Sequence, residues 1–240
     1  MTYFNSDFKI YVDSLSAEGL SPEHIFKFDM YLQLILNNSA KHNITGFKNP
    51  GDIVDNLFID TLRGIKGIIF ENNMRIIDIG TGAGIPSIPI KLIHPSLHLT
   101  LNDSTQKKCS FLSYTLKKLN LSDSEVICER SETLAHKNSY RESFDIAFAR
   151  ALAPLPTLLE LCLPFIKING RIIAYKGRQI EEEIALSKNA LLKLGGNIDD
   201  IVWYTPENIE KKHCIVIITK KFNTPNEYPR KPGIPEKRPL

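Results

Sequence analysis

The chain has 240 residues, of which 42% are hydrophobic and 24% are charged, and its formal net charge is +3. This balance is typical of a globular protein, and the length allows one large domain or two small ones with a full hydrophobic core. The charge is uneven, because residues 211–240 carry +6 whereas the first 210 residues carry −3. Such a mildly acidic body with a basic end is compatible with an acidic partner such as a nucleic acid.

Several classes of protein are excluded. The segment Met1–Tyr11 contains Asp7 and lacks an apolar stretch behind a basic region, which argues against a signal peptide. No apolar run reaches the roughly 18 residues of a membrane span. The cysteines are isolated, without a CxxC pair or a histidine at zinc spacing, so we expect no disulfide framework, no metal site and a reducing cytoplasmic location. They stand at Cys109, Cys128, Cys162 and Cys214.

The N-terminal segment, residues 1–69, is predicted to be a helical extension. Apolar residues recur at helical spacing between Phe8 and Leu15. Ser21-Pro22 has the pattern of an N-cap followed by a proline in the first turn, and it begins a second helix that we expect Asn37-Asn38 to end. A polar loop follows, and a third helix is predicted from Asp52 to Ile69.

From Met74 onward, short apolar runs alternate with amphipathic stretches. Buried strands are predicted at Arg75–Ile79, Leu97–Leu101, Glu125–Cys128, Phe144–Phe148 and Arg171–Tyr175. Helices are predicted between them at Ile88–Ile93, Lys107–Leu119, Leu155–Ile166 and Ile180–Leu194. Alternation of this kind predicts an α/β fold, a doubly wound Rossmann-like sheet that is mostly parallel and covered on both faces.

The end of the chain departs from this alternation. Ile198–Tyr204 and His213–Lys220 have no helix between them, so they predict an antiparallel hairpin at the C-terminal sheet edge. We therefore place the sheet domain at residues 70–221. Residues 222–240 form a basic, proline-rich tail with no apolar periodicity, which we expect to be extended and ordered only against the body or a partner.

The strongest local signal is a glycine-rich loop, Asp78–Pro86, between a predicted strand and a predicted helix. Glycines allow a sharp turn and let a ligand approach the main chain. The dinucleotide fingerprint G-x-G-x-x-G requires a third glycine where Ile85 stands. The glycines lie instead at Gly80, Gly82 and Gly84, which argues against a nicotinamide or flavin site.

An acidic residue completes the pattern. Asp103 ends the second predicted strand, 23 residues after Gly80, where a carboxylate can accept both hydroxyls of a ribose. Together with Asp78 ahead of the loop, this arrangement resembles the S-adenosylmethionine-dependent methyltransferase fold, whose ligand has no pyrophosphate. A tight strand-to-helix turn without a ligand is the competing interpretation of the glycines alone.

Further motifs follow in order along nearly the whole chain. They are Asn43-Ile44-Thr45, the run DIGTGAGIPSIP at Asp78–Pro89, Lys107-Lys108 after Asp103, Arg130-Ser131-Glu132, Ala149-Arg150-Ala151, Lys176-Gly177 and the tail motif Tyr228–Gly233. Together they resemble the bacterial small-subunit (16S) ribosomal RNA guanine-N7 methyltransferases, the glucose-inhibited division protein B family. GIPSIP and the Ala-Arg-Ala strand end are more specific than the glycines.

This resemblance implies a set of site residues. The cofactor, S-adenosylmethionine, would be bound by Asp78, Gly80, Gly82, Gly84, Ile85, Asp103, Ser104, Ser131, Glu132 and Arg150. Two departures from the family pattern stand out. Leu57 occupies the position of a usual histidine ahead of Asp60, which puts a substrate role of that helix in doubt, and Ser131 replaces a usual alanine, a mild change.

The chemistry agrees with methylation of guanine N7. The Asn/Asp-Pro-Pro-aromatic signature of enzymes that methylate exocyclic amines is absent, and none of the cysteines lies in the Pro-Cys loop that attack on a pyrimidine carbon would need. Guanine N7 has an in-plane lone pair and no proton, so orientation suffices and no general base is required. Arg150 would then position the cofactor or a phosphate; its plain structural alternative is an ion pair at a strand end.

Contacts to RNA are predicted at Asn43, Thr45, Lys107, Lys108, Lys176, Arg230 and Lys231. Guanine N7 is inaccessible in the deep major groove of A-form RNA, so the target base should lie in a loop or be extruded. The tail can bind RNA, with Tyr228 stacking on a base, or can strap the sheet edge; both can hold.

We therefore expect a monomeric, metal-free enzyme that uses S-adenosylmethionine to methylate N7 of a guanine in 16S ribosomal RNA, as the free RNA or in the small subunit. Three other functions compete with it. A small-molecule methyltransferase would have a closed apolar pocket, a non-catalytic RNA-binding module would not bind the cofactor, and a dehydrogenase would bind a nicotinamide.

Overall fold

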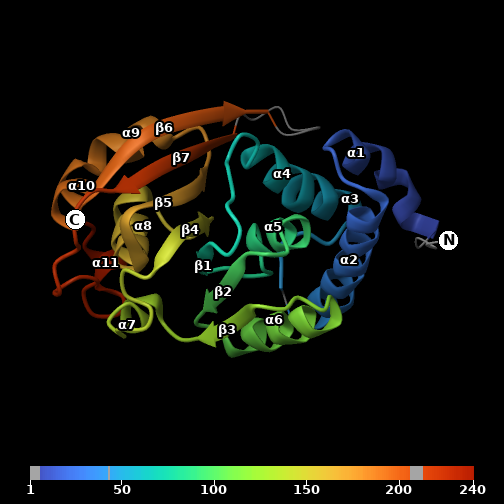
Figure 1. The fold of residues 1–240 in the computed structure, drawn as a ribbon, viewed down its shortest axis with the longest axis horizontal. Coiled ribbons are helices and arrows are strands. Elements are labelled where there is room, and N and C mark those ends of the chain that lie inside the picture. The colour runs from blue at the N-terminus through green and yellow to red at the C-terminus, as the bar shows by residue number, and fades with distance from the viewer. Residues whose placement is uncertain (1–5, 43, 206–212) are drawn as a thin grey trace.

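The computed structural model describes residues 6–42, 44–205 and 213–240, and its centre is one seven-stranded sheet (Figure 1). The strands are β1 (Arg75–Ile79), β2 (His98–Asp103), β3 (Ser124–Cys128), β4 (Phe144–Arg150), β5 (Ile166–Lys176), β6 (Gly196–Tyr204) and β7 (His213–Lys220). Their order is β3-β2-β1-β4-β5-β7-β6. The pairs that β7 forms with β5 and with β6 are antiparallel and the other pairs are parallel, so the predicted mostly parallel sheet with a C-terminal edge hairpin is confirmed.

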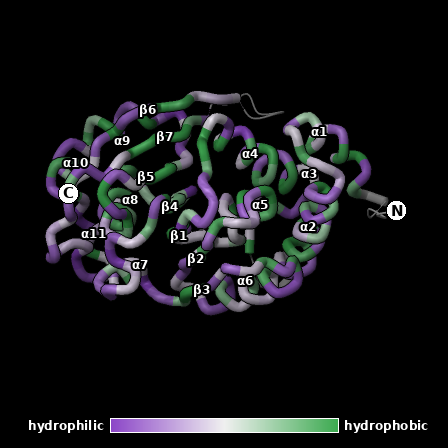
Figure 2. The backbone as a smooth tube through the Cα atoms, viewed as in Figure 1, coloured by the Kyte–Doolittle hydropathy of each residue, from purple (hydrophilic) through white to green (hydrophobic). Residues whose placement is uncertain are grey.

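Helices cover both faces of the sheet and create two hydrophobic cores. The first core lies under α2 (Pro22–His42), α4 (Asp60–Gly64), α5 (Ser87–Ile93) and α6 (Gln106–Lys118). The second lies under α7 (Ser131–Leu134), α8 (Leu155–Cys162), α9 (Ile180–Leu186) and α10 (Lys188–Leu194). Successive strand residues face opposite cores: Ile76 belongs to the first core and Ile77 to the second. Figure 2 shows the corresponding mixture of hydrophobic and hydrophilic residues along α6, and a hydrophobic β7.

Shorter elements complete the fold. They are a 3-10 helix at Ser6–Tyr11, α1 (Val12–Ala17), α3 (Pro50–Ile53), a π-helical segment at Val54–Ile59, a 3-10 turn at Leu163–Phe165 and α11 (Ile234–Lys237). The N-terminal helices share the first core with the sheet, because Phe28 and Tyr31 of α2 are buried in the same cluster as Ile76. In the part of the chain that the structure describes, no helix is long and apolar enough to cross a membrane.

Helix boundaries differ from the sequence prediction in three places. Asn37-Asn38 does not end α2, because the side chain of Asn38 donates to the Leu34 carbonyl one turn earlier and the helix continues to His42. The predicted helix Asp52–Ile69 ends at Gly64 and contains the π-helical segment. The predicted helix Ile180–Leu194 is broken at Ser187, whose buried hydroxyl donates to the Glu183 carbonyl.

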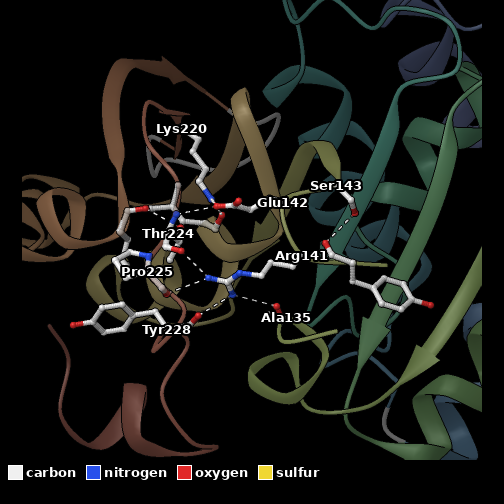
Figure 3. Close-up of polar contacts among 11 residues, drawn as sticks. Ala135, Arg141, Glu142, Ser143, Lys220, Thr224, Pro225 and Tyr228 are labelled. Carbon is white, nitrogen blue, oxygen red and sulfur yellow. Dashed lines mark hydrogen bonds and ion pairs between the residues drawn. The ribbon is translucent and has the colours of Figure 1, made fainter. Parts of the chain in front are cut away.

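The tail, residues 222–240, is ordered against the body beside α7 and α8, at the end of the molecule opposite the N-terminus (Figure 1). Arg141 fixes its first part: the guanidinium donates to the carbonyls of Thr224 (2.7 Å), Tyr228 (2.9 Å) and Pro225 (3.1 Å), and also to Ala135 (3.3 Å) (Figure 3). Tyr228 is only 9% exposed, so its ring is not available to stack on an RNA base.

The next residue, Glu142, anchors the start of the same segment. Its Oε1 atom accepts hydrogen bonds from Lys220 Nζ (2.6 Å) and from the Thr224 amide (2.8 Å) (Figure 3). Lys220 is completely buried, and burial lowers its pKa, although Glu142 opposes that effect. The strap interpretation of the tail is therefore the one that the packing supports.

We predict that Arg141→Lys lowers the free energy of unfolding by about 1–3 kcal/mol, because a lysine cannot serve the carbonyls that the guanidinium fork reaches. The measurement is a thermal or urea melt, combined with limited proteolysis of the tail. Arg171→Lys, at an exposed position of β5, is the matched control and should change neither quantity. Equal stability and equal tail cleavage in both variants would show that Arg141 does not hold the tail.

Candidate active site at the carboxyl edge of the sheet

The glycine loop follows β1 and turns through left-handed backbone. Gly80, Gly82 and Gly84 have φ angles of +66°, +60° and +95°, a region that favours glycine. A Cβ added at Gly80 would lie 2.6 Å from Leu152 Cδ1, and one at Gly84 would lie 2.4 Å from Ile88 Cδ1. At Gly82 the nearest such atom is 4.0 Å away, so open space lies over the middle of the loop.

Asp78 is fully buried below this loop. Its Oδ2 atom accepts a 2.7 Å hydrogen bond from the Thr81 hydroxyl, whereas Oδ1 has no hydrogen bond of good geometry among the described residues. Burial raises the pKa of Asp78 to about 7, against smaller lowering effects from hydrogen-bonding contacts with Thr81 and Ser87. Ile85, another predicted cofactor contact, has a side chain packed in the first core, and its amide donates to the Thr81 carbonyl, so only its backbone faces the loop.

Asp103 ends β2 beside the loop and is only 5% exposed. Its Oδ2 atom accepts from the Gly82 amide at 3.1 Å, and Oδ1 accepts from the Thr105 amide at 2.9 Å. Lys108 Nζ lies 3.6 Å from Oδ2. A carboxylate offers about four acceptor positions, so these contacts leave capacity for the hydroxyls of a sugar.

A cavity of about 380 Å³ opens in front of these groups. Five of the predicted cofactor residues line it, namely Gly80, Asp103, Ser104, Ser131 and Glu132. Lys108, which the sequence assigned to RNA, also lines it, and so do Pro235 and Glu236 of the tail. The sequence did not indicate these last two residues, because the contact depends on how the tail packs.

Glu132 joins the cavity to the tail. Its Oε1 atom accepts from the Gly233 amide at 2.9 Å and from Arg130 Nη2 at 3.0 Å. Burial acts to raise the pKa of Glu132, but these hydrogen bonds outweigh it and hold the pKa below its usual value.

Nearby, Arg230 forms a two-pronged ion pair with Glu160, which is fully buried, and Thr157 donates to the Pro235 carbonyl. The guanidinium of Arg230 therefore has an internal partner.

A second cavity, of about 300 Å³, adjoins the first across Ala151 and Leu152, which line both. Ala151 has a φ angle of +50°, a conformation uncommon for residues other than glycine. The other lining residues are Asp60, Arg150, Leu158, Tyr175, Lys176, Gly177, Tyr204 and His213.

Asp60, on α4, is the centre of the second cavity's charge network. Its Oδ2 atom lies 2.7 Å from Arg150 Nη2, and its Oδ1 atom lies 2.8 Å from His213 Nδ1. Arg150 also donates to the Asn56 carbonyl, and its guanidinium lies 5.3 Å from the centre of the Tyr175 ring. Arg150, which the sequence predicted to position the cofactor or a phosphate, thus lines the second cavity and forms the strand-end ion pair that was its structural alternative.

The residues predicted to contact RNA are separated by the fold. Asn43 lies outside the described residues, and the Thr45 hydroxyl accepts from the Phe47 amide. Lys176 Nζ is held by the Ala153 carbonyl (2.7 Å) and Glu183 (2.6 Å). Lys107 lines a separate surface hollow on α6, and Lys231 is exposed on the tail.

Sequence reasoning assigned no role to His213, because none of the histidines has metal spacing. Its partner Asp60 lies 153 residues away, and only the fold brings the two together. In the described part of the chain, no cluster of His, Cys, Asp and Glu could hold a metal ion.

The strand order, the glycine loop and the acid after β2 define the fold of S-adenosylmethionine-dependent methyltransferases. Among solved structures, a SAM-dependent methyltransferase from Aquifex aeolicus superposes with a TM-score of 0.55 at 16% identity, covering 74% of this chain and 97% of that one. A point mutant of MtNAS in complex with S-adenosylmethionine gives a TM-score of 0.55 at 13% identity, covering 90% and 81%. At these identities the likeness concerns the fold.

The sequence comparisons identify the family. The family model described as GidB, rRNA small subunit methyltransferase G, matches residues 24–210. Proteins named ribosomal RNA small subunit methyltransferase G are 40% identical in Bacillus cytotoxicus and 42% identical in Clostridium kluyveri, in each case over 92% of this chain and 93% of the relative. The chain belongs to this family of methyltransferases, and the resemblance found in its motifs is confirmed.

We predict that Asp103→Ala weakens binding of S-adenosylmethionine at least tenfold, about 1.4 kcal/mol, in isothermal titration calorimetry, because the acceptor of the sugar hydroxyls is lost. Asp52→Ala, at an exposed position of α3, is the control and should bind normally. An Asp103→Ala protein that melts like the wild type and binds with unchanged affinity would show that the ribose lies elsewhere.

A second prediction concerns pH. The folded-state pKa of Asp78, about 7, exceeds the ordinary value of 3.8, so the fold favours its protonated form. The raised pKa of Asp78 contributes stability that is fully present below pH 3.8 and is lost as the pH rises through about 7. Asp78→Asn should therefore lose less stability than the wild type between about pH 4 and pH 7 in thermal melts. Parallel curves for the two proteins would contradict a protonated Asp78.

Proposed function

We propose that this protein transfers a methyl group from S-adenosylmethionine to N7 of a guanine in 16S ribosomal RNA. The observation that carries the proposal is the pair of adjoining cavities, in a member of the small-subunit rRNA methyltransferase G family. One cavity has the groups that suit a nucleoside with a free ribose, and the other opens beside it across Ala151 and Leu152. We further propose that the enzyme works as a monomer without a metal, in the cytoplasm where its substrate is made.

The first cavity suits S-adenosylmethionine by two criteria. The open space over Gly82 allows close approach to the main chain, and Asp103 has acceptor capacity for ribose hydroxyls. Ser131 and Glu132 would flank the adenine, with Ser104 beside the ribose. When bound, S-adenosylmethionine supplies an electrophilic methyl group.

The chain's own contribution to the chemistry is orientation. Guanine N7 is already a nucleophile with an in-plane lone pair, so the site needs no group to remove a proton. Methylation at N7 makes the purine ring cationic, and an unpaired cation beside it would oppose the reaction. Both cations that line the second cavity have carboxylate partners, Arg150 with Asp60 and Lys176 with Glu183. We propose that Arg150 acts here by fixing α4 against the end of β4.

The central test uses labelled S-adenosylmethionine with naked 16S ribosomal RNA, assembled small subunits and whole ribosomes, followed by mapping of the modified base. We expect label at one guanine that becomes sensitive to the chain cleavage specific for N7-methylguanosine. Label in no RNA substrate would overturn the proposal, and label at another atom would overturn the assignment to N7.

RNA binding should depend on the exposed tail lysine. We predict that Lys231→Ala lowers RNA affinity and reduces the slope of log affinity against log salt by about 0.7–0.9, the value for one phosphate contact. Lys167→Ala changes an exposed lysine at the amino end of β5, the opposite edge of the sheet, and serves as the control. A slope that Lys231→Ala leaves unchanged would mean that the tail acts only as a strap.

A further inference from the structure

Two ring side chains of the second cavity, Tyr204 and His213, lie near Asp60 and carry polar atoms that a ligand can contact. Tyr204 ends β6 and His213 begins β7, and the two are directly paired across the hairpin. Their rings stand at 89° to each other with centroids 6.0 Å apart. Both line the cavity next to Ala151 and Leu152, the residues that adjoin the cofactor cavity.

His213 presents a hydrogen-bond acceptor. Its Nδ1 atom lies 2.8 Å from Asp60 Oδ1, and a carboxylate accepts, so Nδ1 carries the hydrogen. The other carboxylate oxygen of Asp60 lies 2.7 Å from Arg150 Nη2. In the neutral ring, Nε2 then carries a lone pair, on the edge opposite Asp60.

Tyr204 presents a donor. Its hydroxyl oxygen is buried and has no hydrogen-bond partner of good geometry among the described residues. Burial raises the pKa of Tyr204, and Asp60 raises it further through its charge and through a hydrogen-bonding contact, so the hydroxyl keeps its proton. A buried hydroxyl without a partner costs free energy, and a ligand that accepts its hydrogen removes that cost.

We propose that His213 and Tyr204 are specificity-determining residues that select guanine by its Watson–Crick edge. His213 Nε2 accepts from guanine N1–H, and the Tyr204 hydroxyl donates to guanine O6. Adenine presents the reverse pattern, an acceptor at N1 and a donor at N6, so it leaves both groups unsatisfied. This inference rests on the proposed function and names the groups that read the base.

The arrangement suits the reaction for two reasons. Reading N1–H and O6 occupies the six-membered ring of guanine and leaves N7, on the five-membered ring, free to react. Leu152, Leu158 and Tyr175 line the same cavity and provide the apolar and aromatic surfaces on which an extruded base packs.

The test replaces the mapped target guanosine in the RNA substrate by splinted ligation with inosine or with 2-aminopurine riboside. Inosine keeps N1–H and O6, whereas 2-aminopurine lacks both and keeps N7. For the wild-type protein we expect kcat/KM for inosine within about threefold of guanosine, and a loss of about a hundredfold for 2-aminopurine, two hydrogen bonds at about tenfold each.

Two variants assign the effect to the named residues. Tyr204→Phe removes the donor, and His213→Asn keeps an amide near the Nδ1 position while removing Nε2. Each should lower kcat/KM for guanosine about tenfold and narrow the preference for guanosine over 2-aminopurine by the same factor. Affinity for S-adenosylmethionine should stay unchanged. Tyr114→Phe, at an exposed tyrosine on α6, is the matched control.

The outcomes separate this inference from the proposed function. Failure of the wild type to label guanosine in any RNA would overturn the proposed function itself. Normal labelling of guanosine with equal labelling of 2-aminopurine would overturn only the inference. An unchanged preference in Tyr204→Phe and His213→Asn would also overturn it, because a purely structural role moves stability and leaves base discrimination intact.

Discussion

The carboxyl edge of the parallel sheet sets the main constraint on this molecule, because several strands end there and the chain must turn away at once. It does so through backbone that L-residues rarely adopt, at Gly80, Gly82 and Gly84 after β1 and at Ala151 after β4. These turns keep the strand ends uncovered, and both cavities lie in the space they leave. At Ala151 this conformation is strained and persists because the surrounding structure fixes it, whereas at Gly80 and Gly84 the neighbouring Leu152 and Ile88 leave no room for a Cβ.

Buried ion pairs then join segments that are distant in the sequence. Asp60 and Arg150 join α4 to β4, Lys220 and Glu142 join β7 to the segment before β4, and Glu160 and Arg230 join α8 to the middle of the tail. Removing one partner of such a pair leaves a buried charge uncompensated, at a cost of about 3–5 kcal/mol. These pairs therefore fix the positions of the segments that they join. They also occupy Arg150 and Arg230, which the sequence predicted to contact the cofactor and RNA.

The sequence predicted those features that depend on residues close together in the chain, and it missed those that depend on residues far apart. The sheet followed from a local pattern, the alternation of strands and helices. The glycine loop and Asp103 are also local patterns, and half of the predicted cofactor residues line the first cavity. The sequence prediction missed the π-helical segment at Val54–Ile59 and the break at Ser187, whose hydroxyl donates to the Glu183 carbonyl four residues earlier. Asp60 pairs with His213, and Pro235 lines the first cavity. Both contacts join segments that are far apart in the sequence, and a periodic pattern of apolar residues does not predict such contacts.

The structure shows that only part of the positive charge of the tail is available to a partner. Its basic residues divide into an internally paired group, represented by Arg230, and exposed residues such as Lys231. The same segment that supplies positive charge at the surface also lines the first cavity through Pro235 and Glu236. The proposed RNA contact at Lys231 and the lining of the first cavity thus belong to one segment.

The most direct measurement is a crystal structure of the protein with S-adenosylhomocysteine. We expect the ligand to lie in the first cavity, with its ribose hydroxyls on Asp103, its sulfur directed toward Ala151 and Leu152, and Pro235 of the tail against it. A ligand bound in another cavity, or a ribose that Asp103 does not contact, would show that the cofactor site has been placed wrongly.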